Sequence, residues 1–248
     1  MQTSNHKLFD QTVFLDKDSH TYKNADGVTY IGFTEFYKNL IEPFPADMVA
    51  SRSAKDGQTK EDVLKEWADK RDLAGAKGTA IDNAIKSYLK GDITTYPEYA
   101  DICKPYENYN RTISDIIVYS DKYKIATEID LTCLITNRKD SWFDIVDFKS
   151  NEQPTTSKYR KWLKEPFDFM TDSTYVKTCW QLSYGAFLLE SLSGKRCRRL
   201  YIHYVPADNI KAHEIIPVMY MKNDLLKALD LHRSGMADPI RTIKAFEF

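Results

Sequence analysis

Three residues with reactive side chains fall within two apolar segments in the middle of the chain. Asp130 lies in the segment 125–135, and Asp147 and Lys149 lie at the end of the segment 142–149. The alternating pattern of the first segment predicts a β-strand, and the second, apolar on both faces, predicts a buried strand. Because only a short polar connection separates the two strands, we expect them to form a hairpin.

This spacing is typical of a site for a divalent cation. Residues two apart on a strand lie on one face, about 6.5 Å apart, so Asp147 and Lys149 share a face. If the hairpin register places Asp130 beside Asp147, two carboxylates and one ammonium meet, and such buried charges need a partner or a metal ion. Carboxylate oxygens favour Mg²⁺ or Mn²⁺, while Lys149 suits the orientation of a water molecule or the neutralisation of phosphate charge. The alternative is a surface hairpin with ordinary salt bridges.

At these residues the sequence resembles the PD-(D/E)XK nuclease superfamily, and within it the branch of phage exonucleases and helicase-associated nucleases (lambda-exonuclease-like). Its members carry an aspartate in one strand and the motif D-x-K at the end of the next, matched here by Asp130 and by Asp147-Phe148-Lys149. The resemblance implies that the side chains of Asp130 and Asp147 and the carbonyl of Phe148 bind the metal ion, with Lys149 as the catalytic lysine. Glu128, on the same predicted face as Asp130, is a further candidate ligand.

Four further positions extend the resemblance. Asp82 stands where relatives carry a metal-binding histidine, so it either replaces that histidine as an oxygen ligand or this contact is lost. Asp115 stands where relatives often place a glutamate, which makes it a candidate acid for a second metal ion or for support of the first. Gln181 and Tyr184, one turn apart on a predicted helix, resemble a Q-x-x-x-Y arrangement of relatives, with Tyr184 one position early for some members. The resemblance implies that Gln181 faces the active site and positions the water or the phosphate, and Tyr184 is a candidate substrate contact.

Basic residues just after the D-x-K motif are the expected contacts to a nucleic acid. Lys158, Arg160 and Lys161 form such a cluster. The formal net charge of −1 argues against a protein that coats nucleic acid by bulk electrostatics, but phosphate contacts need only a local basic strip. The alternative is that the cluster is an ordinary solvated face.

The spacing of the cysteines and the length of the apolar runs limit the cofactors and the cellular location that we expect. The four cysteines are widely spaced without C-x-x-C, so we expect neither a zinc site nor a disulfide framework. Some relatives carry an iron–sulphur cluster on clustered C-terminal cysteines, which this chain lacks, so we expect no cluster. No apolar run approaches the ~20 residues of a membrane span, and the N-terminus lacks a secretory signal. We therefore expect no membrane partner and a cytoplasmic location, in the host cytoplasm if the protein is viral.

The remaining patterns predict the frame that positions these residues. We expect hairpins within 13–31 and strands at 113–119, 198–205 and 213–220. We expect helices at 34–40, near 59–68 with Thr59 and Asp62 as a capping box, within 73–91, and at 173–192 with an end near Gly194. The chain of 248 residues fits a single domain over 1–248 with an N-terminal β-hairpin and a helical insert at about 34–110. The resemblance implies an α/β fold with a central mixed β-sheet flanked by α-helices, a restriction-endonuclease-like core.

The resemblance, together with the predicted cation site, implies a metal-dependent DNA nuclease with Mg²⁺ or Mn²⁺ as cofactor. Exonuclease action on DNA ends, in phage-type recombination, repair or replication, follows from the family alone, as does a recombination partner protein or a homo-oligomer. The alternatives are a catalytically inactive DNA-binding or assembly protein that retains the nuclease fold, and an RNA-directed enzyme. The residues do not distinguish exonuclease from endonuclease action, strand polarity, strand preference or the use of one or two metal ions.

Overall fold

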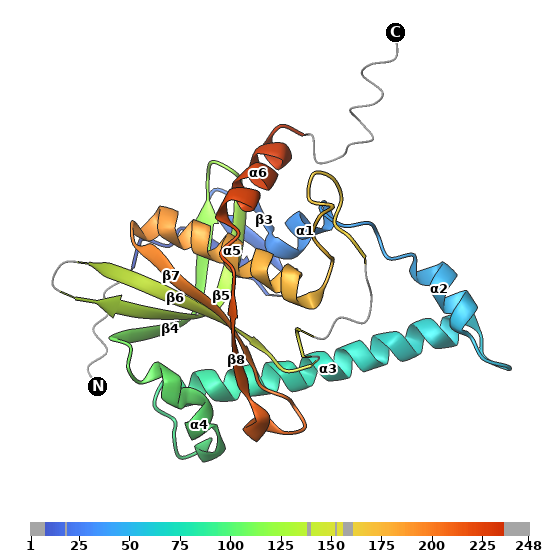
Figure 1. Cartoon of the computed structure of the whole chain (residues 1–248), viewed down its shortest axis with the longest axis horizontal. Helices are drawn as coiled ribbons and strands as arrows, with labels where there is room; N and C mark the ends of the chain where they lie inside the picture. Colours follow the sequence, from blue (N-terminus) through green and yellow to red (C-terminus); the bar gives the residue numbers. More distant parts are fainter. Residues whose placement is uncertain (1–7, 18, 138–139, 152, 156–160, 236–248) are drawn as a thin grey trace, which may run out of the picture.

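A mixed β-sheet forms the centre of the molecule in the computed structural model, which describes residues 8–17, 19–137, 140–151, 153–155 and 161–235. Eight strands of this part of the chain lie in the order β1-β2-β3-β5-β6-β7-β8, with β4 paired to β5 (Figure 1). They are β1 (Val13–Asp16), β2 (Thr21–Asn24), β3 (Thr29–Gly32), β4 (Arg111–Ser120), β5 (Ile125–Thr136), β6 (Ser141–Lys149), β7 (Arg196–Tyr204) and β8 (Glu214–Val218). The helices are α1 (Phe33–Lys38), α2 (Ala46–Ser53), α3 (Lys60–Leu89), α4 (Ala100–Cys103), α5 (Thr174–Ser193) and α6 (Lys222–Arg233). The expected α/β fold, a central mixed sheet flanked by helices, is confirmed.

The connections between the strands follow from their pairing. Strands β5 and β6 form the expected antiparallel hairpin, and α5 carries the chain from β6 to the parallel neighbour β7. Strand β8 pairs with β7 alone and ends the sheet, which suits Pro217 because an edge strand does not need every backbone N–H. At the other side β1, β2 and β3 form two antiparallel hairpins, and β3 joins β5 in parallel.

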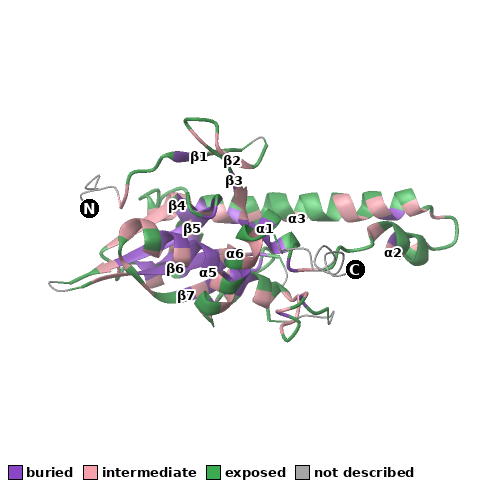
Figure 2. Cartoon of the chain, turned by 90° about the horizontal axis from the view of Figure 1, so that it is seen from above, coloured by how far each residue is buried: buried purple, intermediate pink, exposed green. Residues whose placement is uncertain are grey.

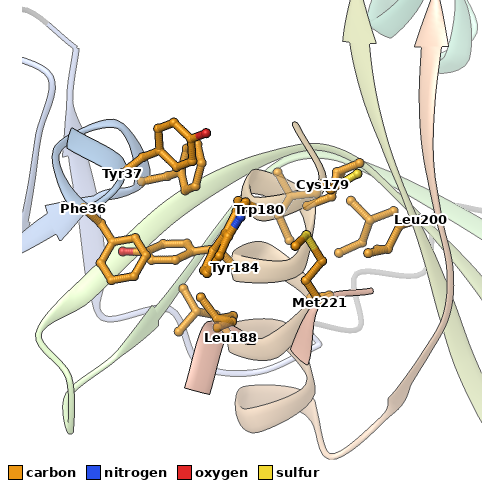
Figure 3. Close-up of a cluster of buried hydrophobic side chains, with 14 of the residues drawn as sticks. Phe36, Tyr37, Cys179, Trp180, Tyr184, Leu188, Leu200 and Met221 are labelled. Atoms are coloured by element: carbon orange, nitrogen blue, oxygen red, sulfur yellow. The ribbon is translucent and has the colours of Figure 1, made fainter. Parts of the chain in front are cut away.

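Helices cover both faces of the sheet. On one face α5 packs with α1 and α6: its buried Tyr184 lies against Phe36 of α1, and its buried Trp180 belongs to the same apolar cluster (Figure 3). On the other face Ile81 and Ile85 of α3 pack with α4. Apolar burial on both faces explains why β5 and β6 read as almost continuously apolar.

The region 59–91 forms one helix of 30 residues, so the prediction of two separate helices was wrong. Its start is the predicted capping box, in which Thr59 and Asp62 each bond the other's backbone N–H. Only the second half packs on the sheet; the first half projects with α2 beside it, largely exposed (Figure 1 and Figure 2). Gly78 lies inside the continuous helix and allows α3 to approach Ser150 closely, because a Cβ at this position would lie 2.9 Å from Ser150 Oγ.

Within the described part of the chain, no helix is long and apolar enough to cross a membrane.

The prediction that side chains alternate strictly between the two faces of the sheet along β5 is wrong after Asp130. Ile129 packs in the cluster that contains α5, whereas Leu131 packs in the opposite cluster around Tyr106, although both were predicted on one face. The facing strand β4 bends at the same level, because Asp115 has a left-handed φ of 58°. A left-handed residue within a strand increases the local twist. In both β4 and β5 the side chains switch between the two faces of the sheet at this level, so the pairing register of the strands is kept. Asp115 and Asp130 therefore sit opposite each other at this bend.

Candidate functional site

The hairpin register brings Asp130 and Asp147 together. The β5–β6 ladder pairs Leu131 with Val146 as its last step, so Asp130 and Asp147 occupy the next facing positions. The strands begin to separate there, and the Phe148 N–H donates a hydrogen bond to Asp130 Oδ2 at 3.1 Å. The side chain of Asp130, instead of a backbone carbonyl, thus continues the contact between the strands.

Asp147 is held from two sides. Gln181 Nε2 donates to Asp147 Oδ1 at 2.9 Å, and Lys149 Nζ lies 2.6 Å from Asp147 Oδ2 in an ion pair. Gln181 reaches the sheet because α5 approaches β5 closely at Gly185, where a Cβ would lie 3.1 Å from the side chain of Ile129. The predicted inward-facing glutamine and the lysine of the D-x-K motif therefore both contact the same buried carboxylate.

Burial and neighbouring charges shift the pKa values of Asp130 and Lys149. Burial, reinforced by the neighbouring charge of Asp147, raises the pKa of Asp130 to about 7. Burial alone would lower the pKa of Lys149, but the charges of Asp147 and Asp130 outweigh it and the pKa is raised. Lys149 is therefore an ammonium that pairs with Asp147, and its charge, like that of Lys86, also acts on Asp130. A further cation near Asp130 would favour its ionised form.

A cleft opens between α3, the bend in β5 at Asp130 and the end of β6. It has a volume of about 500 Å³, and its polar lining includes Asp82, Asp130, Lys149 and Asn151. Its α3 wall is made of small residues: Ala74, Gly75, Gly78 and Thr79. A wall without bulky side chains leaves the helix backbone accessible to a ligand in the cleft. Asp130, at the bend in β5, lines both this cleft and a narrow gap that reaches Asp147 and Gln181.

Lys86 is a site residue that the sequence reading missed. Only 7% of it is exposed, and its ammonium lies 2.6 Å from Asp82 Oδ2 and 2.5 Å from Asp115 Oδ1. Burial would lower the pKa of Lys86, but hydrogen bonds to Asp115 and Asp82 and the charge of Asp130 raise it. The sequence signal was a lysine four residues after Asp82, on the helix face that also carries the buried Ile85.

The other predicted acids lie around this centre. Burial raises the pKa of Asp82, whose Oδ1 is buried and accepts no hydrogen bond from the described residues. Glu128 is half-buried and lines the narrow gap, not the wide cleft, and burial followed by the charge of Asp115 raises its pKa. Asp115 itself contacts Lys86 and lies opposite Asp130.

The residues predicted to contact the substrate differ in their exposure to solvent. Tyr184 is fully buried and its hydroxyl donates to the Ile31 carbonyl at 2.9 Å, so its prediction as a substrate contact was wrong. It lies three residues from Gln181, but α5 is buried almost all round, so its helical position did not indicate the cleft. Lys161 is exposed, with its ammonium over the ring of Phe44. Lys158 and Arg160 lie outside the described residues.

The donor set suits one hard divalent cation. Within the described ranges, no three acidic, histidine or cysteine side chains lie close enough together to hold a metal ion. Asp82 and Asp115 are paired with Lys86, which leaves Asp130 and Asp147 as the acids that face each other next to Phe148. Two carboxylates and a backbone carbonyl are oxygen ligands of the kind that Mg²⁺ and Mn²⁺ accept, with water completing the shell.

Comparisons with known proteins give distant structural neighbours. No protein-family profile and no curated protein sequence matches the chain. Among solved structures, a candidate exonuclease from Eubacterium rectale has a TM-score of 0.43 at 14% identity, covering 88% of this chain and 83% of that one. The crystal structure of SSO0001 has a TM-score of 0.36 at 13% identity, covering 83% of this chain and 75% of that one. Similarities of this size define neither a family nor a function.

Proposed function

We propose that this protein is a metal-dependent nuclease that hydrolyses phosphodiester bonds in DNA. The observation that carries the proposal is the meeting of Asp130 and Asp147 at the separating ends of β5 and β6, with Lys149 in contact with Asp147. A buried carboxyl group such as that of Asp130, whose pKa is raised by burial and by a neighbouring carboxylate, is typical of functional sites. The resemblance of the D-x-K motif to PD-(D/E)XK nucleases supports the same reaction.

The roles of the residues follow from their contacts. A Mg²⁺ or Mn²⁺ ion held by Asp130, Asp147 and the Phe148 carbonyl would supply the positive charge that activates water and neutralises the phosphate. Lys149, an ammonium at the cleft surface, is placed to donate to a phosphate oxygen or to orient the attacking water. Gln181 holds Asp147 Oδ1 and so fixes the carboxylate that faces Asp130.

DNA is the substrate that we propose for the cleft. The small residues of α3 leave room for a sugar–phosphate backbone beside Asp130 and Lys149, and exposed Lys161 is a candidate phosphate contact. Exonuclease action at DNA ends, in recombination, repair or replication, belongs to the proposal through the resemblance of the sequence to phage exonucleases.

A second candidate is a DNA-binding or assembly protein that no longer cuts. The observation that favours it is Lys86, because its ammonium neutralises two of the acids expected near the metal ion. Gln181 and Lys149 both contact Asp147, and Asp130 faces Asp147 across the hairpin, which favours the nuclease.

A digestion assay tests the proposal. Linear duplex DNA, single-stranded DNA, circular plasmid and RNA are incubated with the protein in Mg²⁺, Mn²⁺ or EDTA, alongside Asp147→Asn. We expect metal-dependent cleavage of DNA that EDTA and Asp147→Asn abolish, with linear DNA cut and closed plasmid spared. DNA binding without cleavage in every metal would favour the second candidate, and cleavage in EDTA would contradict the proposed chemistry.

A further inference from the structure

The buried ammonium of Lys86 lies between acids from two different elements. Asp82 on α3 and Asp115 on β4 both contact it, at 2.6 Å and 2.5 Å. Asp130 on β5 lies opposite Asp115 and adds its charge to the same environment. Two carboxylates from two elements thus contact one buried positive charge, and the charge of a third carboxylate, Asp130, acts on it.

We propose that Lys86 takes the place of a second divalent cation and limits the centre to one metal ion. The inference rests on the proposed function, since it assumes that the first ion binds at Asp130 and Asp147. The Lys86 ammonium satisfies one oxygen of Asp82 and one of Asp115, the oxygen ligands that a second ion would require. A second ion could enter only by displacing a buried charge from its partners, which is strongly unfavourable.

The geometry around Lys86 supports this role. Asp115 adopts a left-handed φ of 58°, a conformation that residues other than glycine adopt rarely, and from that position it contacts Lys86. Asp82 Oδ1 is buried and accepts no hydrogen bond from the described residues, so the ion pair between Asp82 Oδ2 and Lys86 compensates the charge of this carboxylate. These features describe a cation site in which an amine of the chain is the cation.

The same helix offers a matched control. Lys90 lies one turn after Lys86, but its ammonium is 3.9 Å from Asp115 Oδ2 and 66% of its side chain is exposed. Its removal changes the net charge by the same amount as the removal of Lys86. Removal of Lys90 leaves the contacts between Lys86 and its two acids in place.

The test counts Mn²⁺ ions bound to the whole chain, by titration calorimetry and electron paramagnetic resonance without DNA. We expect one ion for the wild type and for Lys90→Met, and two for Lys86→Met. Lys86→Arg, which keeps the charge, should bind one ion. Addition of Asp115→Asn to Lys86→Met should return the count to one.

The outcomes separate this inference from the proposed function. One ion in both the wild type and Lys86→Met, or two ions in the wild type, would overturn the inference and leave the nuclease proposal standing. No ion in the wild type would overturn both. If Lys86→Met is too unstable for titration, its melting temperature decides: Mn²⁺ should raise it more than that of the wild type, because two bound ions stabilise the fold more than one. An equal or smaller rise would count against a second site.

Discussion

Strand β6 carries two buried aspartates, Asp144 and Asp147, in contrasting surroundings. Arg198 donates to both oxygens of Asp144, at 3.0 Å and 2.5 Å, and the Tyr109 hydroxyl adds a bond of 2.7 Å. Asp147 has one hydrogen bond from Gln181 and an ion pair with Lys149, and it faces a second carboxylate beside an open cleft. Asp144, with hydrogen bonds to both of its oxygens, stabilises the fold. Asp147, which faces a second acid near the cleft, is available for chemistry.

Substitution of Lys149, the lysine that pairs with Asp147, should strongly reduce activity. Lys149→Ala should reduce the rate of DNA cleavage by about 10²–10³-fold, because it removes a fixed donor and positive charge beside the phosphate. Single-turnover cleavage of linear duplex DNA in Mg²⁺ measures the loss. The control is Lys38→Ala, which removes an exposed lysine paired with Glu35 and should cleave like the wild type. Full activity in Lys149→Ala would remove the catalytic role.

Substitution of Asp144, the aspartate of β6 that Arg198 and Tyr109 hold, should reduce stability and leave activity nearly unchanged. Asp144→Asn should lower the free energy of unfolding by roughly 2–3 kcal/mol, since it leaves Arg198 and Tyr109 without their charged partner. Urea unfolding followed by circular dichroism measures the change. Cleavage per folded molecule should stay close to the wild-type value. Lost cleavage at unchanged stability would mean that the contrast between the two aspartates is misread.

The pH dependence of stability should report Asp130. Its pKa is raised to about 7 in the folded protein, whereas an unfolded aspartate ionises near its ordinary value of 3.8. The unfolded chain therefore loses this proton first, and stability should fall as pH rises from about 4 to 7, by roughly 4 kcal/mol. The measurement compares the wild type with Asp130→Asn by urea unfolding in EDTA across this range. Identical pH profiles would show that Asp130 is not buried beside a like charge.

The smallest effect is expected at Tyr184. Tyr184→Phe should lower the free energy of unfolding by about 1 kcal/mol, because it removes the hydrogen bond to the Ile31 carbonyl and keeps the buried ring. Thermal melting measures this change, and the affinity for DNA should be unaffected. A weaker affinity for DNA at unchanged stability would restore the substrate contact that the sequence suggested.

Local patterns in the sequence predicted the β5–β6 hairpin, the capping box of α3 and the helix α5. Each depends on neighbours within a few residues: an alternating apolar run, a Thr59–Asp62 pair, or Ser173 and Gly194 at the two ends of a helix. The contact between Asp147 and Gln181 was expected only through the family motif, since residues distant along the chain form it.

The features that the sequence did not predict depend on tertiary contacts. Gly75 and Gly78 lower helix propensity, yet α3 stays continuous where Gly78 faces Ser150. The bend at Asp115 and Asp130 requires a left-handed aspartate, which the residue type permits but does not announce. The pairing of Lys86 with Asp115 joins α3 to β4, and no local pattern indicates such a contact.

The central claim is that Asp130 and Asp147 bind one divalent cation. Anomalous scattering from a crystal soaked in Mn²⁺ tests it most directly. We predict a single strong peak between the two carboxylates, within about 2.0–2.4 Å of an oxygen of each. Side chains that face apart with no peak between them, at saturating Mn²⁺, would contradict the claim.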